Sequence, residues 1–546
     1  MERVLGFVIA MSVTMALIPP LMHAADRWRI LDQPSARKVH DKPIPRIGGI
    51  AMAAGILLAL LVLQNSAPAL RAYCAGVVVL LVFGVWDDRV TLSAAPKFVG
   101  QAAAIVIAMM FGDIQIGTLM LDQRYALPEW VALPLTFFFI MGATNAINLA
   151  DGLDGLAGGT TLMCLSAVAL LGFTVGHPYV GAVAVVLIGA VLGFLRFNTH
   201  PARVFMGDSG SQILGFSVAV LSVTLTQDVR APLSSALPLL LLGVPVIDTL
   251  MVMTERVIAG RSPFKADRTH IHHRLLALGF DHHEAVMVIY LLQAALFVVA
   301  WFMRYESDLF ILGAFVVAAL TVIVVLNLAA YRQWHWRLIG ASKRGISSPL
   351  RRRLEWLSAP GRLPLWSLWG AAFALTAYAI PIIAWSSSVS SDIRWLAVAL
   401  TVLMLLSLAV RWKKPQVGWA EKAALYLTAV LIVYLDEWTD ARMHPLRDLQ
   451  WIWLPLLAVS VAVRIRLSTD RRFTVTPLDL LVILMATVLP NLPNSIASVH
   501  TLGIATAKLV VMFYALETLA AGAAHRWRWL SVATLALLAV FLLRCV

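Results

Sequence analysis

Long apolar segments recur along the whole chain, and they constrain its fold more than any other feature of the sequence. Each is about 16–23 residues long, the length that an α-helix needs to cross the hydrocarbon core of a bilayer. The segments are continuous rather than alternating between apolar and polar residues, which excludes a transmembrane β-barrel. The 60% hydrophobic and 13% charged content of the 546 residues agrees. The sequence therefore predicts an all-α polytopic membrane protein.

The apolar segments fall into two sets, with about 11 transmembrane helices in a core and about 7 in a C-terminal extension. The first set is predicted near residues 4–22, 48–64, 72–86, 97–111, 129–147, 160–175, 178–195, 211–226, 233–254, 284–303 and 308–328. The second set is predicted near residues 364–386, 393–411, 419–435, 451–465, 476–490, 503–523 and 528–544. We expect a membrane core at 1–330, a basic cytoplasmic linker at 331–362 and an extension of unknown role at 363–546.

The formal net charge of +13 comes mainly from Lys and Arg in alternate loops, which the positive-inside rule places in the cytoplasm. Topology and anionic lipid headgroups account for this charge, so the bilayer, and not nucleic acid, is the expected partner. Segment 4–22 resembles a signal peptide only weakly, and we expect a retained helix with the N-terminus outside. Cys74, Cys164 and Cys545 lack a paired spacing, so neither a disulfide nor a thiolate metal site is predicted.

Four polar side chains between two apolar segments are the most informative local pattern. Asn145, Asn148, Asp151 and Asp154 recur every three residues, which on a helix would place them on one face. Such a group at the edge of a bilayer is costly unless a polar ligand occupies it. Amides and carboxylates suit a hard cation such as Mg²⁺ together with an anionic ligand. The alternative is a polar seam between helices, which more often uses single Asn or Ser residues.

Two further acidic segments lie on the same predicted side of the membrane. Asp87 and Asp88 end an apolar helix, and adjacent carboxylates repel each other unless they share a cation or a proton. Lys97 and Gln101 follow on the next helix, one turn apart. Asp208 lies between Gly and Ser before a helix expected from about residue 211, where it could hold a metal while backbone N–H groups face phosphate oxygens. The alternatives are solvated acids at a helix end and an ordinary helix N-cap.

The two remaining polar segments are a basic loop and a histidine-rich loop. Lys38 and His40 lie in a Pro-rich loop before a helix that opens with two glycines, an arrangement that suits phosphate, although cytoplasmic loops are basic in any case. His270, His272 and His273 cannot all face the same side of one helix, and no Cys accompanies them. Hydrogen bonding to a nucleotide sugar is therefore favoured over a zinc site.

Taken in order, these five segments resemble the polyprenyl-phosphate N-acetylhexosamine-1-phosphate transferases of glycosyltransferase family 4, and most the bacterial undecaprenyl-phosphate GlcNAc-1-phosphate transferase branch. The resemblance covers residues 1 to about 330, and its specificity lies in the ordered set rather than in any one motif. It implies transfer of a sugar 1-phosphate, with GlcNAc-1-phosphate favoured, from a UDP-sugar to undecaprenyl phosphate. The products are undecaprenyl-diphospho-sugar and UMP, and this step would initiate a cell-envelope polysaccharide such as O-antigen.

The resemblance also implies residue roles. Asp208 and Asn148 match metal ligands, for Mg²⁺ or alternatively Mn²⁺. Catalytic roles fall to Asp87, Asp88, Asp208 and Lys97. Substrate contacts fall to Lys38, His40, Asn145, Asp151, Asp154, Arg203, His270, His272 and His273. A multi-pass protein of the bacterial inner membrane is implied, with its active site facing the cytoplasm. The sequence leaves the oligomeric state open, with a homodimer as one option.

Three questions stay open on the sequence alone. The sugar donor could instead be UDP-MurNAc-pentapeptide or another UDP-HexNAc, although the His-x-His-His spacing looks like the GlcNAc-type branch. Asp87 as a general base is a hypothesis, because a lipid phosphate with a second pKa of about 6 is already largely ionised near neutral pH. A cation or glycolipid transporter is the alternative of a different class. Against it, the acids cluster at helix ends and no internal repeat is visible.

Overall fold

The computed structural model describes residues 2–33, 43–62, 67–228, 232–260, 262, 269–332, 334, 362–385, 391–411, 419–438, 450–467 and 527–544, with 504, 505, 508, 509, 511–513, 515, 516 and 519. Within this part of the chain, 10 helices are long and apolar enough to cross a membrane. The protein is thus an α-helical multi-pass membrane protein, as the sequence predicts. The expected numbers of about 11 and about 7 spans stay predictions, since some of those segments lie outside the described residues.

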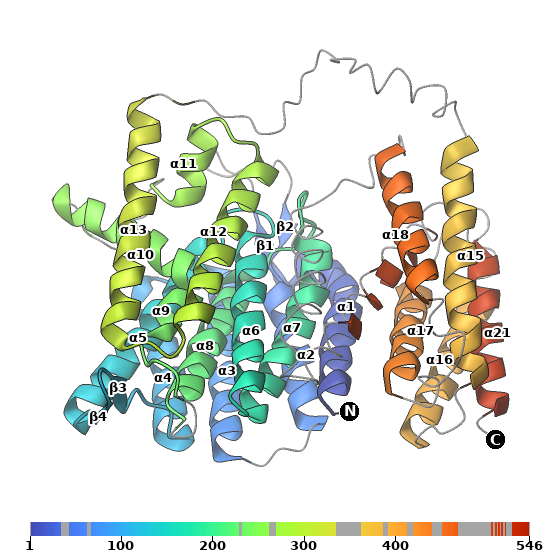
Figure 1. Cartoon of the computed structure of the whole chain (residues 1–546), viewed down its shortest axis with the longest axis horizontal. Coiled ribbons are helices and arrows are strands. Elements are labelled where there is room, and N and C mark those ends of the chain that lie inside the picture. Colours follow the sequence, from blue (N-terminus) through green and yellow to red (C-terminus); the bar gives the residue numbers. More distant parts are fainter. Residues whose placement is uncertain are drawn as a thin grey trace. The chain divides into compact units, whose positions relative to one another are not determined.

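The chain divides into two compact units, Met1–Gly340 with Thr476–Leu478 and the remainder to Val546. The helices of the first unit are α1 (Glu2–Trp28), α2 (Gly48–Val62), α3 (Pro68–Val90), α4 (Ala94–Gly112), α5 (Glu129–Ala150), α6 (Leu156–Thr174), α7 (Pro178–Asn198), α8 (Gly207–Thr226), α9 (Leu237–Leu241), α10 (Gly243–Ile258), α11 (Ile271–Ala277), α12 (His282–Met303) and α13 (Asp308–Tyr331). Two antiparallel strand pairs join them, β1 (Leu31–Asp32) with β2 (Ile44–Pro45) and β3 (Thr118–Met120) with β4 (Arg124–Ala126). In Figure 1 the first pair and α11 lie at one end of this unit, and the second pair lies at the other.

Helix α8 is the central helix of the first unit, and most of its residues are buried. It packs against α2, α3, α5 and α6. Glycines allow the close approach, because a Cβ added to Gly84 of α3 would collide with Ser209, and one added to Gly49 of α2 would collide with Gly210. Small residues at such contacts let membrane helices approach closely. The N-terminus of α8 is thereby held in the middle of the bundle.

The predicted single helix at 233–254 is instead two helices, α9 and α10, and Pro245 gives the physical reason. Proline has no N–H, so it cannot donate to the carbonyl of Leu241 one turn earlier. That carbonyl accepts hydrogen bonds from the Gln293 side chain at 2.9 Å and the Cys164 thiol at 3.0 Å. Gln293 also accepts a hydrogen bond from the N–H of Val244 at 3.0 Å. One buried side-chain amide therefore pairs with backbone groups on both sides of the break between α9 and α10.

The described helices of the second unit are α15 (Arg362–Trp385), α16 (Ser391–Arg411), α17 (Trp419–Trp438), α18 (Gln450–Leu467) and α21 (Trp527–Arg544). The expected linker at 331–362 lies mostly outside the described residues. The helix predicted at 419–435 is longer and also contains Asp436 and Glu437. Both lie in the last turn of α17, are buried, and form ion pairs with Lys508, while Tyr378 donates a hydrogen bond to Asp436 at 2.8 Å.

Two glycines provide a matched test of this packing. A Cβ at Gly189 of α7 would collide with the backbone carbonyl of Phe7 in α1, whereas one at Gly142 of α5 would meet no heavy atom within 4 Å. We expect Gly189→Ala to lower the unfolding free energy by about 1–3 kcal/mol, because a backbone atom cannot move aside. Gly142→Ala should be neutral or should stabilise by up to about 1 kcal/mol. Thermal unfolding in detergent measures both, and equal melting temperatures for the two variants would contradict the α1–α7 contact.

Candidate active site

Four of the five predicted polar segments meet at one end of the first unit, and Lys38 and His40 of the fifth lie outside the described residues. The C-terminal ends of α3 and α5 and the N-terminal ends of α4 and α8 supply Asp87, Asn148, Lys97 and Asp208. These helices run alternately up and down, so residues from separate loops reach the same end of the bundle (Figure 1). The chain topology thus assembles a site that no single segment contains.

Asp88 binds the N-terminus of α8. Its carboxylate accepts hydrogen bonds from the backbone N–H groups of Asp208 at 2.8 Å and Ser209 at 3.2 Å, and from the Ser209 hydroxyl at 2.8 Å. Gly207 makes room, because it has a φ of +71° and a Cβ there would collide with the carboxylate. We expected these amides to face phosphate oxygens, and we expected the helix from about residue 211. Instead α8 begins at Gly207, and a protein carboxylate takes the position expected for the anion.

Lys97 lies between two carboxylates. Its ammonium forms an ion pair with Asp87 and lies 3.6 Å from Asp208. The second oxygen of Asp87 accepts from the N–H of Leu92 at 2.6 Å, in the loop between α3 and α4. Asn148 donates from its side-chain amide to Asp208 at 2.7 Å. The structure therefore brings the side chains of Asp87, Lys97 and Asp208 together with the predicted amide ligand, and Asp88 contacts Asp208 through its backbone N–H.

The oxygen donors here fit the magnesium ion that the resemblance implies. Three carboxyl groups, those of Asp87, Asp88 and Asp208, lie together here, and Lys97 pairs with Asp87 and lies 3.6 Å from Asp208. Asp208 keeps 23% of its side chain exposed, so one carboxylate of the group can be reached. Carboxylate and amide oxygens are ligands that Mg²⁺ prefers. Asp208 and Asn148 are the residues that would hold it.

The period-three pattern does not lie on one helix face as we expected. Asn145 and Asn148 are on α5, but the helix ends at Ala150, and the chain turns through Asp151 and Asp154 to α6. Gly155, with a φ of +80°, permits this turn. The Asp151 side chain is exposed at the turn.

Asn145 pairs with another polar side chain of the core. Its amide donates to Gln101 of α4 at 2.8 Å and to the carbonyl of Met141 at 2.8 Å. Gln101 is buried, so the pair satisfies amide groups that would otherwise be costly in the bundle. This part of the pattern is an interhelical seam, and its predicted substrate contact stays a prediction.

Asp154 is held by the loop between α7 and α8. Its carboxylate lies 2.7 Å from Nδ1 of His200 and accepts from the N–H of Ala202 at 3.0 Å. Burial disfavours the charged form, but these hydrogen bonds outweigh it and hold the pKa of Asp154 below its usual range. The Asn198 side chain also accepts from the N–H of Gly155 at 3.0 Å. Neither His200 nor Asn198 was predicted, since single His and Asn residues in a loop give no signal by themselves.

The three predicted histidines border the turn after α5. His270 lies 2.9 Å from a carboxylate oxygen of Asp248, whose other oxygen accepts from the N–H of Ile271 at 2.7 Å. His272 packs directly under Gly152, where a Cβ would collide with its ring. Burial, reinforced by the neighbouring His273, lowers the pKa of His272 to about 3, so its imidazole is neutral at physiological pH. The ring of His273 lies 4.2 Å from that of His272.

Three predicted site residues remain, Lys38, His40 and Arg203. Lys38 and His40 lie outside the described residues. The backbone N–H groups of Gly48 and Gly49, which follow that loop, donate to the carbonyls of Phe205 and Met206 at 3.0 and 2.8 Å. Arg203 lies in the loop before α8, and its side chain is exposed.

The sequence is similar to proteins of one family. Residues 70–226 match the family described as "Glycosyl transferase family 4". A Bacillus subtilis protein named "Probable undecaprenyl-phosphate N-acetylglucosaminyl 1-phosphate transferase" is 37% identical over 294 residues, which cover 53% of this chain and 81% of that protein. The Mycobacterium leprae decaprenyl-phosphate N-acetylglucosaminephosphotransferase is 37% identical over 49% of this chain and 75% of its own length. The Escherichia coli K12 undecaprenyl-phosphate alpha-N-acetylglucosaminyl 1-phosphate transferase is 32% identical over 50% and 76%.

The matched relatives and the assembled polar site agree with the resemblance seen in the sequence. The family match spans α3 to α8, the helices that carry Asp87, Lys97, Asn148 and Asp208. The chain belongs to glycosyltransferase family 4, among the polyprenyl-phosphate N-acetylhexosamine-1-phosphate transferases.

Proposed function

We propose that this protein transfers N-acetylglucosamine 1-phosphate from UDP-N-acetylglucosamine to undecaprenyl phosphate, releasing UMP. Its family supports transfer of a phosphosugar to a polyprenyl phosphate, and the names of the Bacillus and Escherichia relatives support this lipid and this sugar. The observation that carries the chemistry is the contact of Lys97 with Asp87 and Asp208, next to Asn148. Such a cluster suits phosphoryl transfer, which depends on positioning and charge neutralisation.

In this reaction an oxygen of the lipid phosphate forms a bond to the β-phosphorus of the donor, and the bond from that phosphorus to the bridging oxygen of UMP breaks. Lys97 would donate hydrogen bonds to a phosphate oxygen, and Asp87 orients it. Asp88 holds the N-terminus of α8 and so fixes the position of Asp208. A magnesium ion held by Asp208 and Asn148 would neutralise charge on the diphosphate and polarise the reacting phosphoryl group.

Histidine side chains would bind the other part of the donor. His272 is neutral and lies under the turn that carries Asp151, so it can donate one hydrogen bond without adding charge. Asp248 orients the ring of His270.

UDP-MurNAc-pentapeptide and other UDP-HexNAc donors are the competing substrates. The basic loops at the site end of the core support a cytoplasmic active site in the bacterial inner membrane, where the reaction would start a cell-envelope polysaccharide.

Release of UMP tests the reaction. Purified protein in detergent is given undecaprenyl phosphate, Mg²⁺ and each UDP-sugar in turn. We expect UMP with UDP-GlcNAc, only when lipid phosphate is present, and none after EDTA. Asp208→Asn should lower kcat by at least about 100-fold, because it removes a charge that acts directly at the reacting group. Asp122→Asn, the same change on the exposed β3–β4 hairpin, should leave kcat unchanged. A folded protein that releases UMP from none of the donors would contradict the proposal and favour the transporter.

Asp87 can be tested as a general base. Because its two oxygens already bind Lys97 and the N–H of Leu92, we expect it to position Lys97 rather than to accept a proton. Asp87→Asn should then lower kcat by up to about 100-fold through misplacement of Lys97. The midpoint of the acidic limb in the pH profile of kcat should not move. Loss of that limb in the variant would identify Asp87 as the base.

The lowered pKa of His272 predicts that the stability of the folded protein depends on pH. Its pKa is about 3 in the folded protein and about 6.5 in an unfolded chain, so below about pH 6.5 the unfolded state binds more protons. Stability should fall as the pH decreases through this range, by at most about 1.4 kcal/mol per pH unit from this group. We expect His272→Gln to make the fall in melting temperature shallower, whereas His23→Gln, an exposed histidine of α1, should follow the wild type. Parallel curves for His272→Gln and wild type would contradict the neutral His272.

A further inference from the structure

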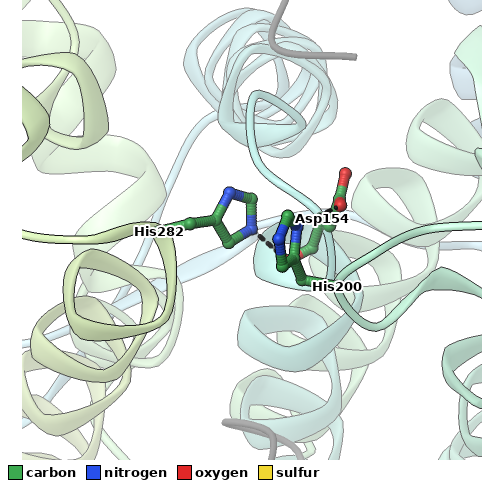
Figure 2. Close-up of side chains that lie close together, drawn as sticks. All are labelled: Asp154, His200 and His282. Atoms are coloured by element: carbon green, nitrogen blue, oxygen red, sulfur yellow. Dashed lines mark hydrogen bonds and ion pairs between the residues drawn. The ribbon is translucent and has the colours of Figure 1, made fainter. Parts of the chain in front are cut away.

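A second group of polar side chains lies beside the turn after α5. Asp154 comes from the turn, His200 from the loop between α7 and α8, and His282 from the first residue of α12 (Figure 2). Each offers one atom that could bind a metal, and these atoms all lie within 4.8 Å of one another. Unlike the group around Asp208, this one contains imidazole nitrogen.

The contacts already orient these side chains toward one another. Nδ1 of His200 lies 2.7 Å from the Asp154 carboxylate, and Nε2 of His282 lies 3.3 Å from the backbone carbonyl of Asp154. The rings of His200 and His282 stack with their centroids 4.1 Å apart and an interplanar angle of 27°. The ring of His283 stands edge-on to His200 at 5.0 Å. Two imidazoles and a carboxylate thus share one small volume.

The nitrogens of His282 are poorly satisfied by protein groups. Its Nδ1 is buried and has no hydrogen-bond partner among the residues that the structure describes, and the contact of its Nε2 is long for a hydrogen bond. Nδ1 of His283 is also buried, and no described residue pairs with it. Buried polar atoms nearly always have a partner, and a bound ion or water is a common explanation when the protein supplies none.

We propose that Asp154, His200 and His282 bind a divalent transition-metal ion of the zinc class, at a site separate from the magnesium site predicted at Asp208. Two imidazole nitrogens and one carboxylate oxygen suit zinc and similar ions, whereas Mg²⁺ prefers oxygen ligands alone. Three protein ligands leave a fourth position for water. The side chain of His200 is 34% exposed, which gives an ion access from solvent.

Metal binding requires side-chain rearrangement, because the two stacked imidazole rings have an interplanar angle of only 27° and their lone pairs do not yet point at one position. Tetrahedral coordination at about 2.0–2.1 Å brings ligand atoms to about 3.3 Å from one another, and the present limit is 4.8 Å. Rotation of the half-exposed His200 ring can supply much of this change. A bound ion would tie together the turn after α5, the loop before α8 and the start of α12. Hydrogen bonds from Gly155 N–H to Asn198 and from the Tyr290 hydroxyl to the Gly155 carbonyl already join these segments.

Cobalt is the probe, because Co²⁺ occupies zinc sites and its visible absorption reports nitrogen ligands and coordination number. Metal-free full-length protein is titrated with Co²⁺ in the presence of excess Mg²⁺, and Zn²⁺ is then added. We expect about one Co²⁺ per chain with the bands of a four- or five-coordinate ion, displaced by Zn²⁺. Zn²⁺ should also raise the melting temperature.

Variants assign the ligands. His200→Ala and His282→Ala should each weaken Co²⁺ binding by at least about 10-fold, and the double variant should lose both the bands and the thermal shift by Zn²⁺. His177→Ala, which removes a histidine 3.6 Å from Asp228 at the other end of α7, is the matched control and should bind normally. His200 is partly exposed, so its replacement removes a ligand with little loss of packing.

The outcome is independent of the transferase reaction. Asp208→Asn should abolish release of UMP and keep Co²⁺ binding, so failure of one proposal is distinguishable from failure of the other. Absence of the cobalt bands in wild-type protein would overturn the metal site and leave a hydrogen-bonded cluster of Asp154 with His200. Binding that persists in a folded His200→Ala, His282→Ala double variant would overturn the assignment of these ligands.

Discussion

The candidate active site depends on the carboxylate of Asp88 at the N-terminus of α8. Two backbone N–H groups and the Ser209 hydroxyl donate to it, and the absent side chain of Gly207 gives it room. A helix N-terminus attracts negative charge, and here the protein supplies that charge from α3. Because Asp88 is only 5% exposed, removal of its donors would leave a buried carboxyl group without hydrogen bonds, which is costly. The position of Asp208 beside Lys97 follows from this contact.

The sequence predicts which residues gather at the site better than it predicts their partners. Asp87, Lys97, Asn148 and Asp208 could be selected because acids, amides and a lysine at the ends of apolar helices are costly without a function. Periodicity could not show that α5 ends at Ala150, because the break depends on the turn through Gly155. Nor could it show that the amides of α8 bind Asp88, since a helix N-terminus accepts a phosphate or a carboxylate equally well.

The two polar groups near the turn after α5 differ in the atoms that they offer. The group at Asp208 offers carboxylate and amide oxygens, which suit a hard ion. The group at Asp154 offers two imidazoles and one carboxylate, which suits a softer ion. A direct substrate contact by Asp154 would compete with its bonds to His200 and Ala202. The two proposed sites would therefore select different ions.

The second unit contains a group of charged side chains, Asp436, Glu437 and Lys508, that pair with one another. The Asp436 carboxylate accepts a hydrogen bond from the Tyr378 hydroxyl and forms an ion pair with the Lys508 ammonium. Glu437 forms an ion pair with the same ammonium. All three charged side chains are at most 4% exposed. Asp208, by contrast, is 23% exposed, and Lys97 stays 3.6 Å away from it. Buried charges must be paired in either unit, and in the first unit the Asp208 carboxylate is also partly exposed and within reach of a ligand.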